Sequence, residues 1–557
     1  MASRREPACR PPGRAHARLP FETAYDRRRD SADGRGPVTT AVASPPPARV
    51  DSERPVTSPA PLLPALDPGP TDTLRGWVVT GFITLIAAVT RLTMLNYPTD
   101  GGTPVFDEKH YAPQAWQVLT GGWLEDNPGY GLVVHPPVGK QLIALGEAIF
   151  GYESWGWRFS SAVAGTLIVL LVVRIVRRLS RSTMVGAIAG ILMIAESVTF
   201  VSSRLGMLDI FLALFAVAAL GCLVVDRDEM RRRYAVVAAQ QRMGLSEFGP
   251  RMGVRWWRFG AGVMLGLACG TKWSGIYFIA FFGVLCIGFD IAARRAYGVQ
   301  RPWLGTALRD LGPALYALVL VPVAVYLATY WPWFASETGV DRHAVGVKVG
   351  TDGPFSFIPD ALRSLWYYSG NVLNFHEELT NSAGNRHPWE SKPWTWPMGL
   401  RPMLYYFVDG DSVSGCEHTS CVKAILLVGT PAMWWLALAI LAWGMWQFLV
   451  RRDWRYATVL TAYGAALLPW FLTLDRQMYY FYAVALAPFL VMALALTLGD
   501  IIGKASNSDE RRSTGLLAVS LYIGLVIANF VWLWPILTAA PISASNWDLQ
   551  QWLPSWR

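Results

Sequence analysis

Long apolar segments alternate with short basic turns along most of this chain, and that alternation restricts what it can fold into. A helix crossing the roughly 30 Å hydrocarbon core of a bilayer needs about 20 mostly apolar residues, because each residue adds about 1.5 Å. The chain is therefore predicted to be an all-α polytopic membrane protein with about eleven transmembrane helices. The predicted spans are 76–95, 157–175, 183–200, 207–225, 259–271, 274–293, 312–330, 425–450, 456–473, 479–499 and 515–535.

The composition agrees with a membrane protein and argues against a soluble one. Hydrophobic residues make up 53% of the 557 residues and charged residues only 16%, whereas soluble domains usually carry about 25% charged residues. The formal net charge of +9 does not indicate nucleic-acid binding, because the arginines gather in short runs between the apolar segments. Such runs are typical of cytoplasmic loops.

The basic runs also predict the orientation of the chain. If all of them are cytoplasmic, eleven spans place the N-terminus inside and the C-terminus outside the plasma membrane. Two long segments, 96–156 and 331–424, then lie on the extracytoplasmic side. The runs are Arg174 to Arg181, Arg227 to Arg233, Arg294 and Arg295, Arg451 and Arg452, and Arg511 and Arg512.

Four parts are predicted along the chain. Residues 1–75 are rich in Arg, Pro, Ala and Ser and lack apolar periodicity, which predicts a disordered cytoplasmic tail. Residues 76–330 form a first transmembrane module that includes the external loop 96–156. Residues 331–424 form a large extracytoplasmic loop, and 425–557 hold the last spans and a short external tail.

Two adjacent carboxylates, Asp107 and Glu108, occur in the stretch PVFDEKHYAPQ after the first span. Neighbouring acids raise each other's pKa and desolvation raises it further, so one of the two is a candidate general base. A solvated turn is the alternative interpretation. A divalent metal bound with His110 and His135 is a third, although the spacing matches no closed metal motif.

The next stretch, VVHPPVGKQLIALGEAIFG, predicts an amphipathic helix in the membrane interface. The two prolines favour an extended entry followed by a helix start. His135 suits a packed or hydrogen-bonded role, and Lys140 suits a side chain that reaches toward the headgroups. Both residues are also candidate substrate contacts because they share this external loop.

Charged residues recur at the predicted outer ends of the spans. Arg158 is predicted either to contact lipid headgroups or to bind a phosphate through paired hydrogen bonds. Arg204 and Asp209 lie in the stretch VSSRLGMLDIFLALF. They are predicted either to form an ion pair across a turn or to belong to a functional site. Lys272, in LACGTKWSGIYF, adds another cation on the same face. Together with the two acids, they suit an enzyme that holds a lipid-linked phosphate and activates a hydroxyl.

Two cysteines are predicted to pair. Cys416 and Cys421 enclose a short segment, SGCEHTSC, within the second external loop. Disulfides persist in oxidising compartments, so this pair is expected to be joined if the loop is extracytoplasmic.

The order of the motifs resembles the protein O-mannosyltransferase family, in its actinobacterial branch. The resemblance runs from about Gly76 to the C-terminus, and several ordered motifs are more specific than any single one. The stretches that carry it are FDEKHYAPQAW, HPPVGK, RFSSAVAGTL, SRLGMLDIFL, CGTKWSG, HPWESKPWTWP and VGTPAMWW.

The resemblance implies a GT-C glycosyltransferase fold and transfer of mannose from a polyprenyl phosphate mannose donor to Ser or Thr hydroxyls of proteins crossing the membrane. It further implies an inverting reaction without a metal or other cofactor. Asp107 matches the family's catalytic base and Glu108 its neighbour, associated with acceptor placement. Arg158 matches an arginine expected at the donor phosphate. Arg204, Asp209 and Lys272 match motifs near the site without a firm role.

The sequence departs from eukaryotic members at two places. The loop 331–424 is too short to contain their β-trefoil insertion, and the acid that precedes their HPP motif is missing from the stretch GLVV here. Two other functions remain open at this point. One is a GT-C transferase that glycosylates a lipid, and the other is a transporter or flippase of lipid-linked sugars. The expected partners are membrane lipids, the translocating acceptor and the secretion channel, without nucleic acid.

Overall fold

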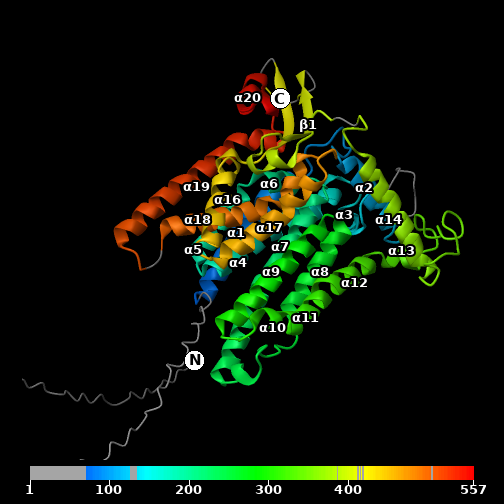
Figure 1. Cartoon of the computed structure of the whole chain (residues 1–557). Helices are drawn as coiled ribbons and strands as arrows, with labels where there is room; N and C mark the ends of the chain where they lie inside the picture. The colour runs from blue at the N-terminus through cyan, green and yellow to red at the C-terminus, as the bar shows by residue number, and fades with distance from the viewer. Residues whose placement is uncertain are drawn as a thin grey trace, which may run out of the picture. The chain divides into compact units, whose positions relative to one another are not determined.

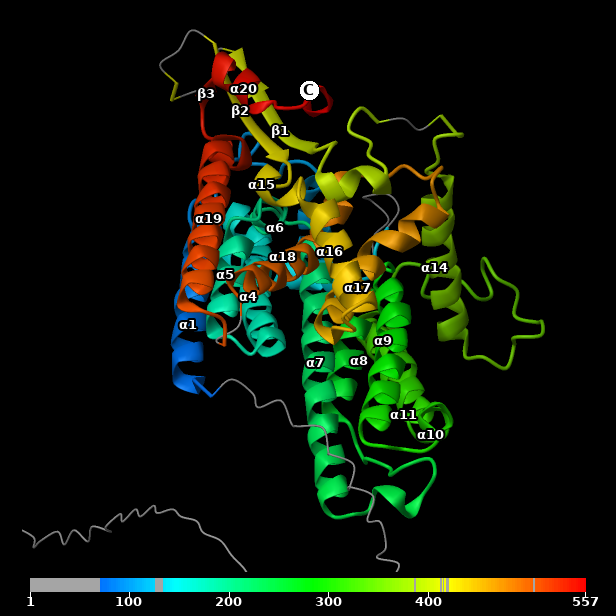
Figure 2. The same ribbon diagram turned by 60° about the vertical axis from the view of Figure 1, so that its left-hand side comes forward.

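The computed structural model describes residues 71–125, 134–384, 387–410, 413, 415–416, 420–503 and 506–557. The predicted cytoplasmic tail lies almost entirely outside the described residues. The described part of the chain is mostly helical, with one small sheet (Figures 1 and 2).

Helices occupy all eleven predicted spans of the described chain, which confirms a multi-pass membrane protein. Seven helices in the described residues are long and apolar enough to cross a membrane. They are α1 (Thr73–Leu92), α4 (Ser154–Ser180), α7 (Asp209–Ala239), α9 (Gly275–Ala296), the run of α11 (Leu311–Leu315), the π-helical turn η3 (Tyr316–Leu320) and α12 (Val321–Thr329), the run of α15 (Pro431–Trp434) and α16 (Ala437–Leu449), and α19 (Asp509–Thr538).

The other four predicted spans contain shorter helices. The apolar run is interrupted by a bend after α5, by a 3-10 segment after α17 and by a 3-10 segment before α18, whereas α8 covers the whole of its predicted span. They are α5 (Thr183–Ile194) with α6 (Ser197–Ser202), α8 (Trp256–Thr271), α17 (Trp454–Leu467) with η6 (Leu468–Leu472), and η7 (Tyr480–Ala485) with α18 (Ala487–Ile502).

Further helices lie in the segments between the spans. The helix predicted after the two prolines is confirmed as α3 (Val138–Phe150). The remaining ones are α2 (Glu108–Thr120), η2 (Met243–Leu245), α10 (Pro302–Arg309), α13 (Trp331–Ala335), α14 (Asp360–Glu378), η4 (Pro393–Met398), α20 (Ala544–Gln550) and η8 (Pro554–Trp556).

A three-stranded antiparallel sheet, which the sequence analysis did not predict, joins the second external loop to the C-terminal tail. Its strands lie in the order β1 (Met403–Asp409), β2 (Cys421–Leu427) and β3 (Ile542–Ser543). The span expected over 425–450 therefore begins later, with its first helix at Pro431, because the preceding residues pair with β1. The predicted disulfide Cys416–Cys421 is present at the start of β2.

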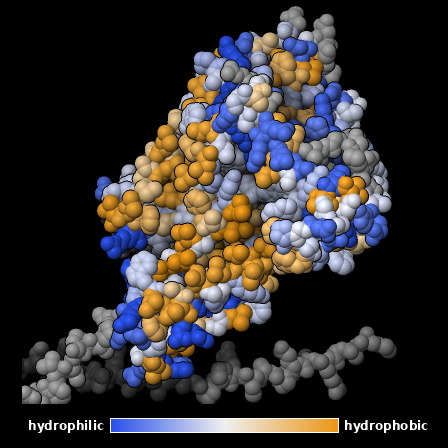
Figure 3. Space-filling model, turned by 45° about the vertical axis from the view of Figure 1, so that its right-hand side comes forward, coloured by the Kyte–Doolittle hydropathy of each residue, from blue (hydrophilic) through white to orange (hydrophobic). Residues whose placement is uncertain are grey.

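Hydrophobic residues gather over the helical part of the face seen in Figure 3, whereas the lobe at the right is largely hydrophilic. Many exposed side chains of the spans are large and apolar, including Phe82 and Leu85 of α1 and Leu517 and Leu521 of α19. In a soluble protein such side chains would be an aggregation hazard. In a membrane they face lipid.

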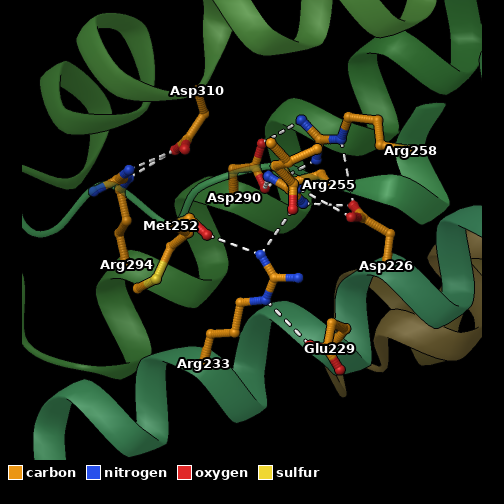
Figure 4. Close-up of polar contacts among 10 residues, drawn as sticks. Asp226, Glu229, Arg233, Met252, Arg255, Arg258, Asp290, Arg294 and Asp310 are labelled. Carbon is orange, nitrogen blue, oxygen red and sulfur yellow. Dashed lines mark hydrogen bonds and ion pairs between the residues drawn. The ribbon is translucent and has the colours of Figure 1, made fainter.

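A buried ion cluster holds α7, α8 and α9 together near one of their ends (Figure 4). Arg255 binds Asp226 of α7 at 2.5 Å and Asp290 of α9 at 2.8 Å. Arg258 of α8 binds Asp290 at 2.9 Å. All four side chains are buried, and each charge has a partner, so the cluster is neutral and resists separation of the three helices.

Candidate active site

A cavity of about 300 Å³ lies at the opposite ends of these three helices. Asp209 is the first residue of α7, Lys272 directly follows α8, and Ser274 precedes α9. Side chains from α2, α14, η6 and η7 complete the wall. The lining includes Asp107, Tyr111, His135, Asp209, Lys272, Trp273, His376, Trp470, Arg476, Tyr479, Phe481 and Tyr482.

Asp107 is the N-cap residue of α2 and lines this cavity. The preceding residue, Phe106, has a φ of 51°, in the left-handed region that a bulky side chain rarely adopts. Its ring stacks on Tyr405 of β1 at a centroid distance of 4.3 Å. Such a conformation persists only where surrounding contacts hold the residue in place, and strained residues of this kind are frequent at active sites.

The Asp107 carboxylate is suited to accept a proton. It is half-buried and accepts no hydrogen bond from the residues that the structure describes. Burial raises the pKa of Asp107 to about 6, although the nearby Lys272 and His110 lower it and Asp209 raises it. Such a carboxyl is ionised at neutral pH and remains more basic than an ordinary aspartate.

Lys272 and Asp209 form an ion pair in the wall of the cavity. The Lys272 Nζ donates to both carboxylate oxygens of Asp209, at 2.9 and 2.8 Å. The ammonium also lies 5.5 Å from the ring centroid of Phe481 and 5.8 Å from that of Tyr482. Both charged groups are thereby fixed at the lining, and an ammonium has three donors to share with a further anion.

Arg476 supplies a second cation to the lining. Its Nη2 donates to the Nδ1 of His376 at 3.2 Å, and the Nε2 of His376 donates to the carbonyl oxygen of Val134 at 2.9 Å. The carbonyl can only accept, so His376 carries its proton on Nε2 and is neutral. The Nε of Arg476 is buried and has no hydrogen-bond partner among the described residues.

His135 lines the cavity beside this pair. Its ring lies 5.5 Å from that of His376, nearly parallel, and 6.1 Å from that of Tyr111. Burial lowers the pKa of His135 well below its usual value, and the neighbouring cations Lys272 and Lys140 lower it further. His135 is therefore a neutral residue of the wall, which agrees with the packed role that the sequence favoured.

Glu108 does not line the cavity, although it is adjacent to Asp107 in sequence. Its fully buried carboxylate binds the Nε and Nη2 of Arg158 at 2.8 and 2.7 Å. It also accepts the backbone N–H of Gly206 at 2.6 Å and that of Val105 at 3.2 Å. A carboxylate with four such donors has a structural role in this arrangement, not the acceptor contact that the resemblance implied.

Arg158 is likewise enclosed by the protein. Beyond its pair with Glu108, it donates to the carbonyl oxygens of Leu95 and Pro98, at 3.0 and 2.8 Å. Its side chain is fully buried. The predicted contact between Arg158 and a donor phosphate therefore does not fit this structure, because the guanidinium is used to join α4 to the chain after α1.

Arg204 and Lys140 also lie outside the cavity lining. Arg204 does not pair with Asp209 but donates to backbone oxygens at the end of α1, among them that of Thr93 at 2.7 Å. The last carbonyls of a helix lack partners within the helix, and Arg204 supplies donors to them. Lys140 is buried, pairs with Glu125 and donates to the carbonyl oxygen of His135 at 3.0 Å.

Arg476 and His376 line the cavity although neither was predicted from the sequence to be a site residue. Arg476 lies between the predicted spans 456–473 and 479–499, in an aromatic stretch on the same predicted face as Lys272. That location was a usable signal, because it predicts a further cation on the face that holds Lys272. His376 offered no comparable signal, because its position in the long loop becomes meaningful only when α14 packs beside the cavity.

Comparisons with known proteins identify the family and the fold of this chain. The family model described as dolichyl-phosphate-mannose-protein mannosyltransferase matches residues 153–336. The model described as the C-terminal four TMM region of protein-O-mannosyltransferase matches residues 361–556. Among solved structures, the S. cerevisiae protein O-mannosyltransferase Pmt1-Pmt2 complex bound to the sugar donor has a TM-score of 0.66 at 16% identity, covering 87% of this chain and 93% of that chain. This likeness supports the predicted GT-C fold.

Curated relatives are more similar in sequence. The polyprenol-phosphate-mannose--protein mannosyltransferase of Mycobacterium tuberculosis (strain CDC 1551 / Oshkosh) is 62% identical over 503 residues, covering 90% of this chain and 96% of the relative. The enzyme of the same name from Corynebacterium glutamicum is 45% identical over 483 residues, covering 85% and 92%. The chain therefore belongs to the protein O-mannosyltransferase family.

Proposed function

We propose that this chain transfers mannose from a polyprenyl phosphate mannose donor to Ser or Thr hydroxyls of proteins, with inversion at the sugar. The main support is the composition of the cavity. Its lining brings together Asp107, whose carboxylate accepts no hydrogen bond from the described residues, and two cations, Lys272 and Arg476. Family membership supports the same reaction. The relatives are named as polyprenol-phosphate-mannose--protein mannosyltransferases, which specifies this donor and a protein acceptor.

The proposed chemistry is a single displacement. Asp107 accepts the proton of the acceptor hydroxyl while that oxygen forms a bond to C1 of the mannose. The bond between C1 and the phosphate oxygen breaks, and its electron pair leaves with the phosphate. Lys272 and Arg476 stabilise the charge that develops on this leaving group. Holding the hydroxyl, C1 and phosphate in line contributes further, since positioning lowers the barrier of a two-substrate reaction.

Arg476→Gln is expected to lower kcat/KM for the donor by about 10²-fold, because it removes a charge-assisted contact to the phosphate. Single-turnover and steady-state assays with labelled donor measure this change. Lys109→Gln is the control, since Lys109 is a cation of the first external loop that is 57% exposed and does not line the cavity. If Arg476→Gln and Lys109→Gln had the same kcat/KM for the donor, the contact between Arg476 and the phosphate would be excluded.

The rate is expected to depend on pH through Asp107. Because burial raises the pKa of this carboxyl to about 6, the base is protonated at lower pH, and kcat/KM should fall about tenfold per pH unit below that value. Above the pKa the base is ionised and the profile levels off. Initial rates from about pH 5 to about pH 8 measure this profile. A flat profile across pH 6 would contradict a proton-accepting role for Asp107.

We expect the reaction to need no divalent metal, because Lys272 and Arg476 already supply positive charge at the phosphate. Treatment of the purified enzyme with EDTA should leave the transfer rate unchanged. Addition of Mg²⁺ or Mn²⁺ after this treatment should not raise the rate. Loss of activity in EDTA that returns with one of these ions would assign the phosphate to a metal.

The acceptor class is tested by supplying labelled donor with either a Ser/Thr/Pro-rich peptide or a lipid acceptor. Label in the peptide, released by β-elimination from Ser or Thr, supports protein mannosylation. Label in the lipid alone would favour a glycolipid transferase. Movement of intact donor across the bilayer without release of free polyprenyl phosphate would favour a flippase.

The proposed topology places the N-terminus in the cytoplasm and the cavity outside. The Cys416–Cys421 disulfide supports it, since disulfides persist outside the reducing cytoplasm. The same side would receive acceptor chains from the secretion channel. Protease protection of an N-terminal tag in intact cells tests the orientation.

A further inference from the structure

A second pocket lies at the far end of α8 from the catalytic cavity, and the proposed reaction does not use it. It is a groove of about 760 Å³ between the chain before α8, the first turns of α8, and the junction of α10 with α11. Lys272 and Trp256 flank opposite ends of α8, whose 16 residues separate them by about 24 Å. Figure 1 shows α10 and α11 at the lower end of the bundle.

The charges at the base of this groove are already paired. Arg255 is held by Asp226 and Asp290, and Asp310 accepts from the Nε of Arg294 at 2.8 Å (Figure 4). These contacts connect α7, α8, α9 and the end of α10. They make the groove a preformed feature, and they leave neither Arg255 nor Asp310 as an unpaired charge for a ligand.

Two further cations line the groove without an acidic partner. Arg251 is exposed and forms no ion pair with any residue that the structure describes. Arg309 is half-buried, and its Nε is buried without a hydrogen-bond partner in the described chain. Because the other charges are paired, the lining carries a net positive charge. Guanidinium groups match phosphate oxygens through paired hydrogen bonds.

The rest of the groove is apolar and opens among exposed hydrophobic side chains. Trp256 is 70% exposed, Leu308 58% and Tyr316 54%. Tyr316 begins the π-helical turn η3, a feature often found at functional sites. In a membrane protein, a group of large exposed apolar side chains such as these faces lipid. A ligand of this groove therefore needs both an anionic group and a hydrocarbon chain.

We propose that the groove binds an anionic phospholipid, with its phosphate on Arg251 and Arg309 and an acyl chain along Trp256, Phe259 and Tyr316. Arginine and tryptophan are common at the boundary between headgroups and hydrocarbon. The charge complementarity selects an anionic headgroup over a zwitterionic one. Binding at this end does not require the transfer reaction, so the proposal stands apart from the proposed function.

Native mass spectrometry of the full chain, delipidated in detergent, tests the proposal with phosphatidylglycerol and phosphatidylcholine as probes. Wild type should bind phosphatidylglycerol about tenfold more tightly than phosphatidylcholine. The double variant Arg251→Gln/Arg309→Gln should lose about 10²-fold in phosphatidylglycerol affinity, because it removes two charge-assisted contacts that each contribute at least about tenfold. Arg232→Gln is the matched control, because Arg232 is an exposed cation of α7 outside the groove lining.

A groove-filling variant tests the apolar part without changing a charge. Gly312 lines the groove, and a Cβ at this position would meet no heavy atom within 4 Å. Gly312→Trp should therefore fold and weaken phosphatidylglycerol binding. Unchanged affinity in both the double variant and Gly312→Trp would overturn the proposal. Full displacement of the lipid by millimolar inorganic phosphate would also overturn it, because it would reveal a simple anion site.

Discussion

Asp107→Asn should lower the rate of mannosyl transfer by about 10³-fold while the protein keeps its fold. Asparagine has nearly the same shape but cannot accept the hydroxyl proton, and general bases typically contribute 10²–10⁴-fold. The Asp107 carboxylate accepts no hydrogen bond from the described residues, so the replacement breaks no hydrogen bond among them. Labelled transfer to a peptide gives the rate, and thermal unfolding in detergent gives the stability.

Asp100→Asn is the control for this prediction. Asp100 lies in the same external segment, is 67% exposed and does not line the cavity. Its replacement should leave the transfer rate within about twofold of wild type, as expected of a surface change. A comparable rate in Asp107→Asn would remove Asp107 as the base, and unfolding of that variant would give Asp107 a structural role instead.

Arg158→Met is expected to destabilise the protein by about 3–5 kcal/mol, because it leaves the Glu108 carboxylate buried without its charged partner. Both side chains of this pair have no exposed surface. The apparent Tm in detergent and the yield of monodisperse protein should both fall. Activity should fall only in proportion to the amount of folded protein, since Arg158 does not line the cavity.

The double variant Glu108→Gln/Arg158→Met separates the two roles assigned to Arg158. It removes the buried negative charge together with its partner, so it should be more stable than Arg158→Met alone. If Arg158 instead contacted the donor phosphate, Arg158→Met would melt like wild type and show only a raised KM for the donor. That outcome would restore the role implied by the resemblance.

The positions of the spans were predictable because the free energy of placing a segment in lipid depends on the residue types within that segment. The helices α1, α4 and α9 begin within four residues of the predicted spans 76–95, 157–175 and 274–293. The strands were not predictable in the same way. β1 and β2 pair across a loop, and β3 reaches β2 from the C-terminal tail more than 100 residues later, so no local pattern indicates the pairing.

The same distinction between local composition and long-range pairing applies to the candidate site. Charged residues at the outer ends of the apolar spans could be predicted from the sequence, since unpaired charges are excluded from hydrocarbon. Their partners could not, because they depend on how distant segments pack. Glu108 and Arg158 are 50 residues apart in sequence, and Asp209 and Lys272 are 63 apart.

Adjacent residues consequently have different roles. Asp107 and Glu108 have the same chemistry, but the start of α2 turns one toward the cavity and the other into the protein. Arg476 is a candidate for the donor phosphate because it lines the cavity, where it contacts His376, 100 residues away in sequence. The sequence determined the fold class and the chemical types available to the site, because both depend on local composition. The tertiary structure determined which carboxylate and which cations face the cavity, because pairing depends on distances between segments that only folding brings together.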